Sequence, residues 1–532
     1  MEKRLILALV LSLLVLIFWQ RLSGRKLPET PSADDRMKAV QSAGPMPKEA
    51  SSALPSSPAG DLSTSLKVPE EPLFWLENTN LKLGVGQKTG VIRHALIKGY
   101  HEDLRRDSPM VDLSHMGQAM ISSPVFAYAT QNGFERLVPN EVTVHNDAGK
   151  KKLELTFEGL RAAYEILPQG YSFSVSIKKE GGYRLPAPIV MLWPFGTTKE
   201  EGKDRYHISS FQGLVGKKLS SIPLAKLKEA KDIQGPFPWV GFGDKFFFQA
   251  LIDDSRPFLE VRLIPLNAHG FVMSVPLFDG AAQESALDRD LTCFMGPKAY
   301  DVLKVQGHDL VRVVDFGMFG FLGRPLLVTL KFFHRLLGNW GLAIIAVTVL
   351  LKLLLAPLTH QSYQSMRKMT VLQPKIRALQ ERYKNDRTRL SQETMALYKA
   401  HKVNPLGGCL PTLIQIPVFF AFYYTLINTV ELRHAPFFWW IQDLSAKDPY
   451  LVTPLLMGAS MIALQLLTPN QQNTNPTQQR MMLLMPIVFT FIFLSLPSGL
   501  VLYYLFSNIL SIAHLLFFRQ WQKNRPLLAQ AS

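Results

Sequence analysis

The chain has 532 residues, of which 47% are hydrophobic, and its formal net charge is +16 at pH 7. This length predicts several folded units, and the crowding of apolar residues into the last 200 positions indicates a membrane protein rather than a soluble enzyme. The Lys and Arg residues cluster beside apolar segments as topology signals, so nucleic-acid binding is not expected, and the two cysteines, Cys293 and Cys409, are too few for a disulfide framework or a zinc site.

The first expected element is a membrane anchor at residues 1–19. Lys3 and Arg4 precede an uncharged run that ends at Trp19, an interfacial type of residue, and no A-x-A cleavage pattern follows. We therefore favour an uncleaved signal anchor with its N-terminus inside over a cleaved signal peptide. Residues 20–72 are rich in Ser, Ala and Pro and predict a disordered tether on the outer side.

Residues 73–314 show alternation of apolar and polar side chains, which is typical of half-buried strands. Two runs are clear: one contains Leu153, Leu155 and Phe157, and the other contains Phe173, Val175 and Ile177. Turn clusters separate these runs, so we predict a large all-β sandwich. No catalytic spacing of carboxylates, histidines or a nucleophile occurs in it, which favours a binding or scaffolding domain over a catalytic one.

Residues 315–340 predict an amphipathic helix lying at the membrane interface. Leu326, Leu330, Phe333 and Leu337 share one face at helical spacing, with basic residues on the rest. The alternative is a helix that packs on the β-domain.

Five further apolar runs predict membrane spans at 341–358, 405–430, 451–468, 481–496 and 500–518. The last two form one run of 38 residues, about 57 Å as a single helix, so they must be two spans that break at Pro497, Ser498 and Gly499. Loops at 431–450 and 469–480 and a tail at 519–532 complete the region. With the anchor, the prediction is a polytopic α-helical membrane protein with six spans.

Loop charges orient these spans. The 359–404 loop holds ten Lys or Arg residues, whereas the 431–450 loop holds Arg433 and Lys447. The first is therefore predicted to be cytoplasmic, with both termini, and the β-domain lies on the outer side. Helical spacing on both sides of "KNDRT" makes the 359–404 loop a basic helical hairpin. It serves either as a topology determinant or as a docking surface for acidic partners or lipid headgroups.

Lys352 places an ammonium group inside the 341–358 span, where a charge costs about 2.5–3.5 kcal/mol on insertion scales. Thr348 lies one turn before it, Gln415 lies in the 405–430 span, and the last span repeats polar residues at helical spacing: Tyr504, Ser507, Asn508 and Ser511. None of the five C-terminal predicted spans carries an Asp or Glu partner. The alternatives are snorkelling of the lysine with ordinary interhelical hydrogen bonds, or a wet groove open to the cytoplasm.

Several segments resemble the YidC/Oxa/Alb family of membrane protein insertases. These are "LQPKIRALQERY", "NPLGGCLPTLIQIPVFFAFYYTL", "ELRHAPFFWWIQDLSAKDPY" and "LPSGLVLYYLFSNILSI". The resemblance, of the Gram-negative type, implies a five-helix insertase core and a periplasmic β-supersandwich in the bacterial inner membrane. It also implies a non-enzymatic insertase and chaperone without metal or cofactor. Its expected partners are nascent membrane proteins, lipid, the Sec translocon with its accessory subunits and, more weakly, the ribosome.

The resemblance also assigns roles to residues. Lys352 stands where the family has a groove arginine that attracts acidic segments of substrates, Thr348 and Tyr504 match positions important to function, and substrate spans are expected to slide along the helices carrying Phe419 and Tyr504. A lysine can lose its proton in a dry site, whereas arginine keeps its charge.

A transporter is the competing function, because a lone intramembrane cation often marks a substrate or ion path. The five C-terminal spans show no repeated halves, which many transporter folds have. An intramembrane hydrolase is excluded because Ser498 and His514 are about 24 Å apart along a helix and no H-E-x-x-H motif occurs.

Overall fold

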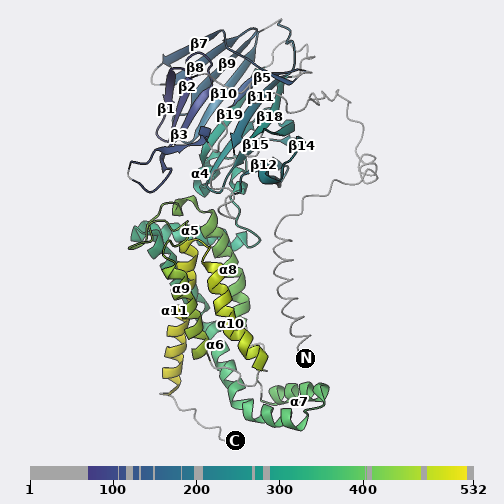
Figure 1. The fold of residues 1–532 in the computed structure, drawn as a ribbon, viewed down its shortest axis with the longest axis vertical. Helices are drawn as coiled ribbons and strands as arrows, with labels where there is room; N and C mark the ends of the chain where they lie inside the picture. Colours follow the sequence, from purple (N-terminus) through teal and green to yellow (C-terminus); the bar gives the residue numbers. More distant parts are fainter. Residues whose placement is uncertain are drawn as a thin grey trace, which may run out of the picture. The chain divides into compact units, whose positions relative to one another are not determined.

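The computed structural model describes residues 70–523 with gaps at 106, 116–123, 131–132, 148–149, 181–182, 197–207, 267–269, 279–287, 402, 404–409 and 469–475. The predicted anchor, nearly all of the predicted tether and the end of the tail lie outside the described residues. Within them, strands β1 to β19 form one body and helices α5 to α11 form another (Figure 1). This confirms an all-β domain followed by a helical region.

The strands of the described residues form three antiparallel sheets. The smallest has the order β1-β2-β3-β4, from Leu73–Glu77, Leu81–Gly86, Ile92–His101 and Met110–Asp112. The largest has the order β13-β12-β15-β16-β19-β10-β9-β8-β7, from Lys218–Pro223, Ser210–Val215, Trp239–Gly243, Phe247–Asp253, Asp288–Pro297, Ser172–Lys179, Leu160–Ile166, Lys150–Phe157 and Glu141–Asp147. The third has the order β14-β17-β18-β11-β5-β6, from Lys231–Phe237, Phe258–Pro265, Gly270–Phe278, Ile189–Gly196, Val125–Thr130 and Gly133–Arg136.

One hydrophobic core runs between the sheets. The alternating residues that predicted strands β8 and β10 all point into it, and none of Leu153, Leu155, Phe157, Phe173, Val175 and Ile177 is more than 4% exposed. Successive residues of a strand face opposite sides, so this alternation follows directly from burial of one face. Short helical elements complete the domain: η1 Leu113–His115, η2 Leu224–Lys226, α4 Tyr300–Gln306 and η3 Leu310–Val313.

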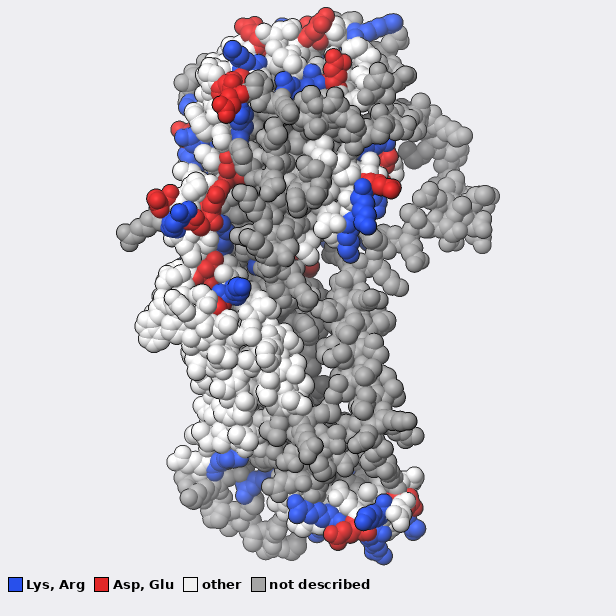
Figure 2. Space-filling view, viewed as in Figure 1, with Lys and Arg blue, Asp and Glu red and all other residues white. Residues whose placement is uncertain are grey.

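The helical region comprises α5 Gly320–Leu337, α6 Trp340–Arg382, α7 Arg387–Ala400, α8 Leu410–Asn428, η5 Val430–Leu432, α9 Val452–Leu467, α10 Pro476–Phe493 and α11 Ser498–Lys523. Among the described residues, α6 and the 498–520 part of α11 are long and apolar enough to cross a membrane, and Ile414–Asn428, Val452–Leu467 and Leu484–Phe493 are shorter apolar helices. The count of six spans therefore stays a prediction. Exposed side chains of the bundle include Leu353, Leu354, Leu484, Ile487 and Phe491, and Figure 2 shows a broad uncharged surface on the visible face of this region.

Helix α6 continues past Leu358, where the sequence suggested the end of a span, and includes the first arm of the predicted basic hairpin. The change from apolar to polar residues there is not a helix end, and α6 continues through both Pro357 and Pro374. The chain turns at residues 383–386, at the "KNDRT" segment, and Asp386 caps α7 by accepting from the backbone N–H of Arg389. Ile376 then packs near Leu397 and Tyr398, so the predicted hairpin forms.

The apolar face of α5 that was predicted to lie on the membrane packs mainly against other helices. Leu326 and Leu330 are buried in the core of the bundle, where α5 packs against α6 and α8, while Leu337 is 42% exposed. A second apolar set on α5 is exposed instead: Phe321, Val328, Phe332 and Leu336. The predicted face therefore packs mainly on protein, and the second set remains available for lipid.

Candidate functional site

Lys352 lies on α6, and its ammonium group donates a hydrogen bond of 2.8 Å to Ser511 Oγ on α11. The Ser511 hydroxyl donates in turn to the backbone oxygen of Ser507, at 2.9 Å. Ser511 therefore accepts from the lysine with its lone pair and uses its own proton elsewhere. A hydroxyl can do both at once because it carries one donor and two acceptor sites.

Gln415 on α8 joins the same group of residues. Its side-chain Nε2 donates to Ser507 Oγ at 3.2 Å. The structure thus links polar side chains of three helices, α6, α8 and α11, through Ser507 and Ser511. Ser507 is 1% exposed, whereas Lys352, Gln415 and Ser511 are half-buried. We call Lys352, Gln415, Ser507 and Ser511 the polar network.

The acceptor of the lysine is neutral, which decides the electrostatics of the polar network. Helices α8, α9, α10 and α11 contain no Asp or Glu, and neither does the 340–358 part of α6. Ser511 therefore holds the ammonium group in position without cancelling its charge. An uncompensated charge in a poorly solvated site exerts a stronger field than the same charge in water, so this arrangement can attract an anionic group.

Two residues of the predicted groove make other contacts. Thr348 is 1% exposed, and its hydroxyl donates to the backbone oxygen of Ile344 in its own helix. Asn508 turns to α9, where its Nδ2 donates to Ser460 Oγ at 3.0 Å. The polar stripe on α11 thus divides among three neighbouring helices, α6, α8 and α9, and the sequence did not indicate Ser460 as a partner.

An aromatic group lies next to the polar network along α8 and α11. The rings of Phe419 and Tyr504, the two residues expected on the slide, meet edge to face with centroids 5.8 Å apart. Phe493, at the end of α10, contacts both rings, with centroid distances of 6.5 Å to Phe419 and 5.2 Å to Tyr504. Sequence reasoning did not single out Phe493, which lies inside the apolar run of the predicted 481–496 span and ends helix α10.

The described residues support neither a hydrolase site at Ser498 and His514 nor a metal site. Ser498 begins α11 and donates to the backbone oxygen of Asp443, while His514 lies sixteen positions further along the same helix against the ring of Tyr363. Within the described ranges, no group of three or more His, Cys, Asp or Glu side chains could hold a metal ion.

Comparison with known proteins gives consistent matches over the described parts of the chain. Residues 75–329 match the family model "YidC periplasmic domain", and residues 332–525 match the model "60Kd inner membrane protein". A membrane protein insertase YidC from Syntrophus aciditrophicus is 36% identical, over 96% of this chain and 98% of that protein. A membrane protein insertase YidC from Geotalea uraniireducens is 48% identical over 59% of each chain. A crystal structure of an active YidC insertase matches with a TM-score of 0.36 and 18% identity, covering 84% of this chain and 92% of that one.

Proposed function

The chain belongs to the YidC family of membrane protein insertases, and from this membership we propose that it inserts integral proteins into the bacterial inner membrane and assists their folding, alone or beside the Sec translocon. The β-domain then lies in the periplasm and both termini lie in the cytoplasm, as the loop charges predict. The transporter alternative finds no support among the relatives, which are named membrane protein insertases.

The observation that supports this function is the position of the Lys352 ammonium group. It lies in a half-buried network, bonded to the neutral Ser511 Oγ at 2.8 Å, and neither helices α8 to α11 nor the 340–358 part of α6 contains a carboxylate. A polar or acidic segment that enters from the cytoplasm gains attraction to this charge, which offsets part of its loss of hydration. The network would thereby lower the barrier to moving that segment into the membrane.

The remaining side chains of the network add hydrogen-bonding capacity. Gln415, Ser507 and Ser511 offer amide and hydroxyl groups that can replace water around a polar segment. They are held by one another across three helices, so little reorganisation is needed when a client arrives. Thr348 stabilises α6 itself, because its hydroxyl donates a hydrogen bond to the backbone oxygen of Ile344 in the same helix.

The apolar part of a client requires a different surface. Phe419, Phe493 and Tyr504 form an aromatic group beside the network, and the outer faces of α6 and α10 expose leucine, isoleucine and phenylalanine. A client span can pack on the aromatic group while its polar end remains near Lys352, and then leave for lipid along α8. Phe419 and Tyr504 keep their expected role as a slide, and Phe493 joins them.

Complementation in cells depleted of the native protein tests the role of Lys352. Variants Lys352→Arg, Lys352→Ala and Lys352→Glu are compared, with Lys304→Ala on the exposed side of α4 as a control for loss of a lysine. The client is a single-span protein with a short outer tail, in an acidic and a neutralised version. We expect Lys352→Arg and Lys304→Ala to support insertion, and Lys352→Ala and Lys352→Glu to slow the acidic version several-fold more than the neutralised one.

Equal insertion of the acidic client by wild type, Lys352→Ala and Lys352→Glu would show that the charge has no electrostatic role. A second arm uses purified protein in liposomes. Flux of a small solute without any insertion of the client would favour the transporter.

A further inference from the structure

The last residue of α8 and the segment that follows it make polar contacts with the β-domain, with α5 and with the residues just before α5. Asn428 Nδ2 donates to the backbone oxygen of Asp315 at 2.6 Å. Glu431 Oε1 lies 2.6 Å from Lys331 Nζ, which also pairs with Asp301 of α4 at 2.7 Å. These contacts attach the outer end of α8 to both α5 and α4.

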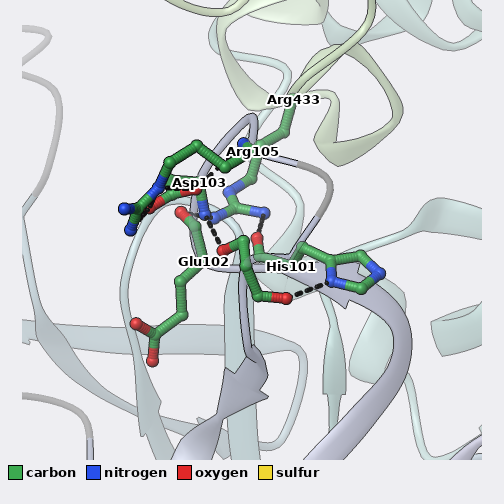
Figure 3. Close-up of polar contacts among 6 residues, drawn as sticks. His101, Glu102, Asp103, Arg105 and Arg433 are labelled. Carbon is green, nitrogen blue, oxygen red and sulfur yellow. Dashed lines mark hydrogen bonds and ion pairs between the residues drawn. The ribbon is translucent and has the colours of Figure 1, made fainter.

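Arg433 extends this attachment to the β3–β4 loop. Its guanidinium group donates to the backbone oxygens of His101, at 2.6 Å, and Glu102, at 2.9 Å (Figure 3). The same group lies over the ring of Phe247, 5.7 Å from its centroid. A planar guanidinium suits two neighbouring acceptors because its N–H groups are held in a fixed fork. Arg433 therefore recognises the shape of the loop backbone and not the side chains at positions 101 and 102.

The β3–β4 loop is itself braced so that these two carbonyls have a defined direction. His101 Nδ1 lies 2.8 Å from the backbone oxygen of Ser108, and Ser108 Oγ accepts from the backbone N–H of Asp103 at 2.9 Å. The Asp103 carboxylate pairs with Arg105 in the same loop (Figure 3). The loop thus offers Arg433 a preformed acceptor site, which reduces the ordering cost of the contact.

Apolar packing reinforces the polar contacts. Val430 is 1% exposed and belongs to the hydrophobic core of the β-domain, together with Phe316 and Leu327. Val430 therefore ties the segment after α8 to that core, while Leu432, two positions later, belongs to the core of the helical bundle. Asn428 ends α8, and Phe419 lies nine residues earlier, about 14 Å along the helix. A fixed outer end of α8 restrains the helix that carries Gln415 and Phe419.

We propose that Arg433 is a positioning residue for insertion: by clamping the β3–β4 loop, it couples the β-domain to α8 and so holds Gln415 and Phe419 in place. This inference rests on the proposed function of the polar network and the aromatic group. The β-domain then stabilises the position of α8 in the insertase core through these contacts. A protein that binds or displaces the β3–β4 loop would change insertion through α8.

Four variants test the clamp by their effects on insertion and on geometry. Arg433→Ala removes both hydrogen bonds, Arg433→Lys keeps the charge without the fork, and Glu102→Ala removes a side chain whose backbone oxygen, and not its carboxylate, accepts from Arg433. The fourth pairs Arg433→Ala with Lys352→Ala. Distances between spin labels at Leu104→Cys and Tyr450→Cys, both exposed positions, are measured by pulsed electron paramagnetic resonance in a Cys409→Ser background, while Cys293 is buried.

We expect Arg433→Ala to broaden the label distances and to slow insertion of the acidic and the neutralised clients alike, because it displaces a helix and removes no groove charge. Arg433→Lys should fall between Arg433→Ala and wild type, and Glu102→Ala should match wild type. The client dependence separates this effect from loss of Lys352, which should slow the acidic client preferentially, and the double variant should show both effects.

Three results would overturn the proposal. Unchanged label distances in Arg433→Ala would mean that the clamp does not hold the loop. Broadened distances with wild-type insertion would mean that the β-domain is not coupled to α8. A defect of Glu102→Ala equal to that of Arg433→Ala would contradict recognition of the backbone. If Arg433→Ala fails to accumulate, Arg433→Lys gives the same comparison.

Discussion

Gly458 sets the closest approach of α9 and α10. A Cβ atom at position 458 would lie 2.1 Å from Thr490 Oγ1 and 3.2 Å from Thr490 Cβ. The Thr490 hydroxyl is already fixed, because it donates to the backbone oxygen of Pro486 at 2.7 Å. An alanine at position 458 therefore forces either a rotation that breaks this hydrogen bond or a separation of the two helices.

The expected cost follows from these two routes. Breaking the hydrogen bond costs about 0.5–1.5 kcal/mol, and separating well-packed helices costs about 1–3 kcal/mol. Alanine also favours helix over glycine by about 1 kcal/mol, which partly hides the clash in the single variant Gly458→Ala. Because that gain is the same when Thr490 is replaced, a double-mutant cycle with Thr490→Ala isolates the clash. We expect a coupling free energy of about 1–3 kcal/mol, with the double variant more stable than the sum of the single effects predicts.

The cycle can be measured by unfolding the purified protein in mixed micelles with increasing SDS, followed by tryptophan fluorescence. Thr490→Ser keeps the hydroxyl and serves as the matched control, since it should retain the clash with Gly458→Ala. Additivity of Gly458→Ala and Thr490→Ala within about 0.5 kcal/mol would refute the argument that these two side chains determine the spacing of α9 and α10.

Two further predictions concern the polar network and the β-domain. Ser511→Ala removes the acceptor of Lys352 and should slow insertion of the acidic client. Ser495→Ala is its matched control, at an exposed serine whose hydroxyl donates to the backbone oxygen of Ile492, and it should not slow insertion; equal rates for the two variants would contradict the positioning of the ammonium group by Ser511. In the β-domain, burial lowers the pKa of Lys298 to about 8, opposed by Asp244 and Asp315. The unfolded chain, with an ordinary lysine pKa of 10.5, binds more protons between these values, so stability should rise with pH from about 8 to 10.5. Lys298→Met should remove that rise in thermal unfolding scans, and an unchanged pH profile would exclude Lys298 as its source.

Much of the architecture was readable from local pattern. The alternation of Leu153, Leu155 and Phe157 predicted a buried strand face, because successive side chains of a strand point in opposite directions. The "KNDRT" segment predicted the turn between α6 and α7, because the helical spacing of apolar residues on each side of it is also a local property. Polarity alone did not predict where α6 ends, since a helix can pass from lipid to water without a break.

For the candidate functional residues too, some properties were predictable from the sequence and others depended on the fold. The sequence by itself determined that Lys352, Gln415 and the stripe on α11 are polar residues in apolar segments, because a side chain's polarity and its helical spacing are local properties. Only the tertiary structure decided their partners: Ser511 holds Lys352 and Ser507 joins Gln415, while Asn508 turns to Ser460. Nothing in the sequence pointed to the partners of Arg433, whose acceptors are backbone oxygens more than 330 positions away. Every residue has such an oxygen, so a contact of this kind leaves no pattern in the sequence and exists only once the fold has brought the two segments together.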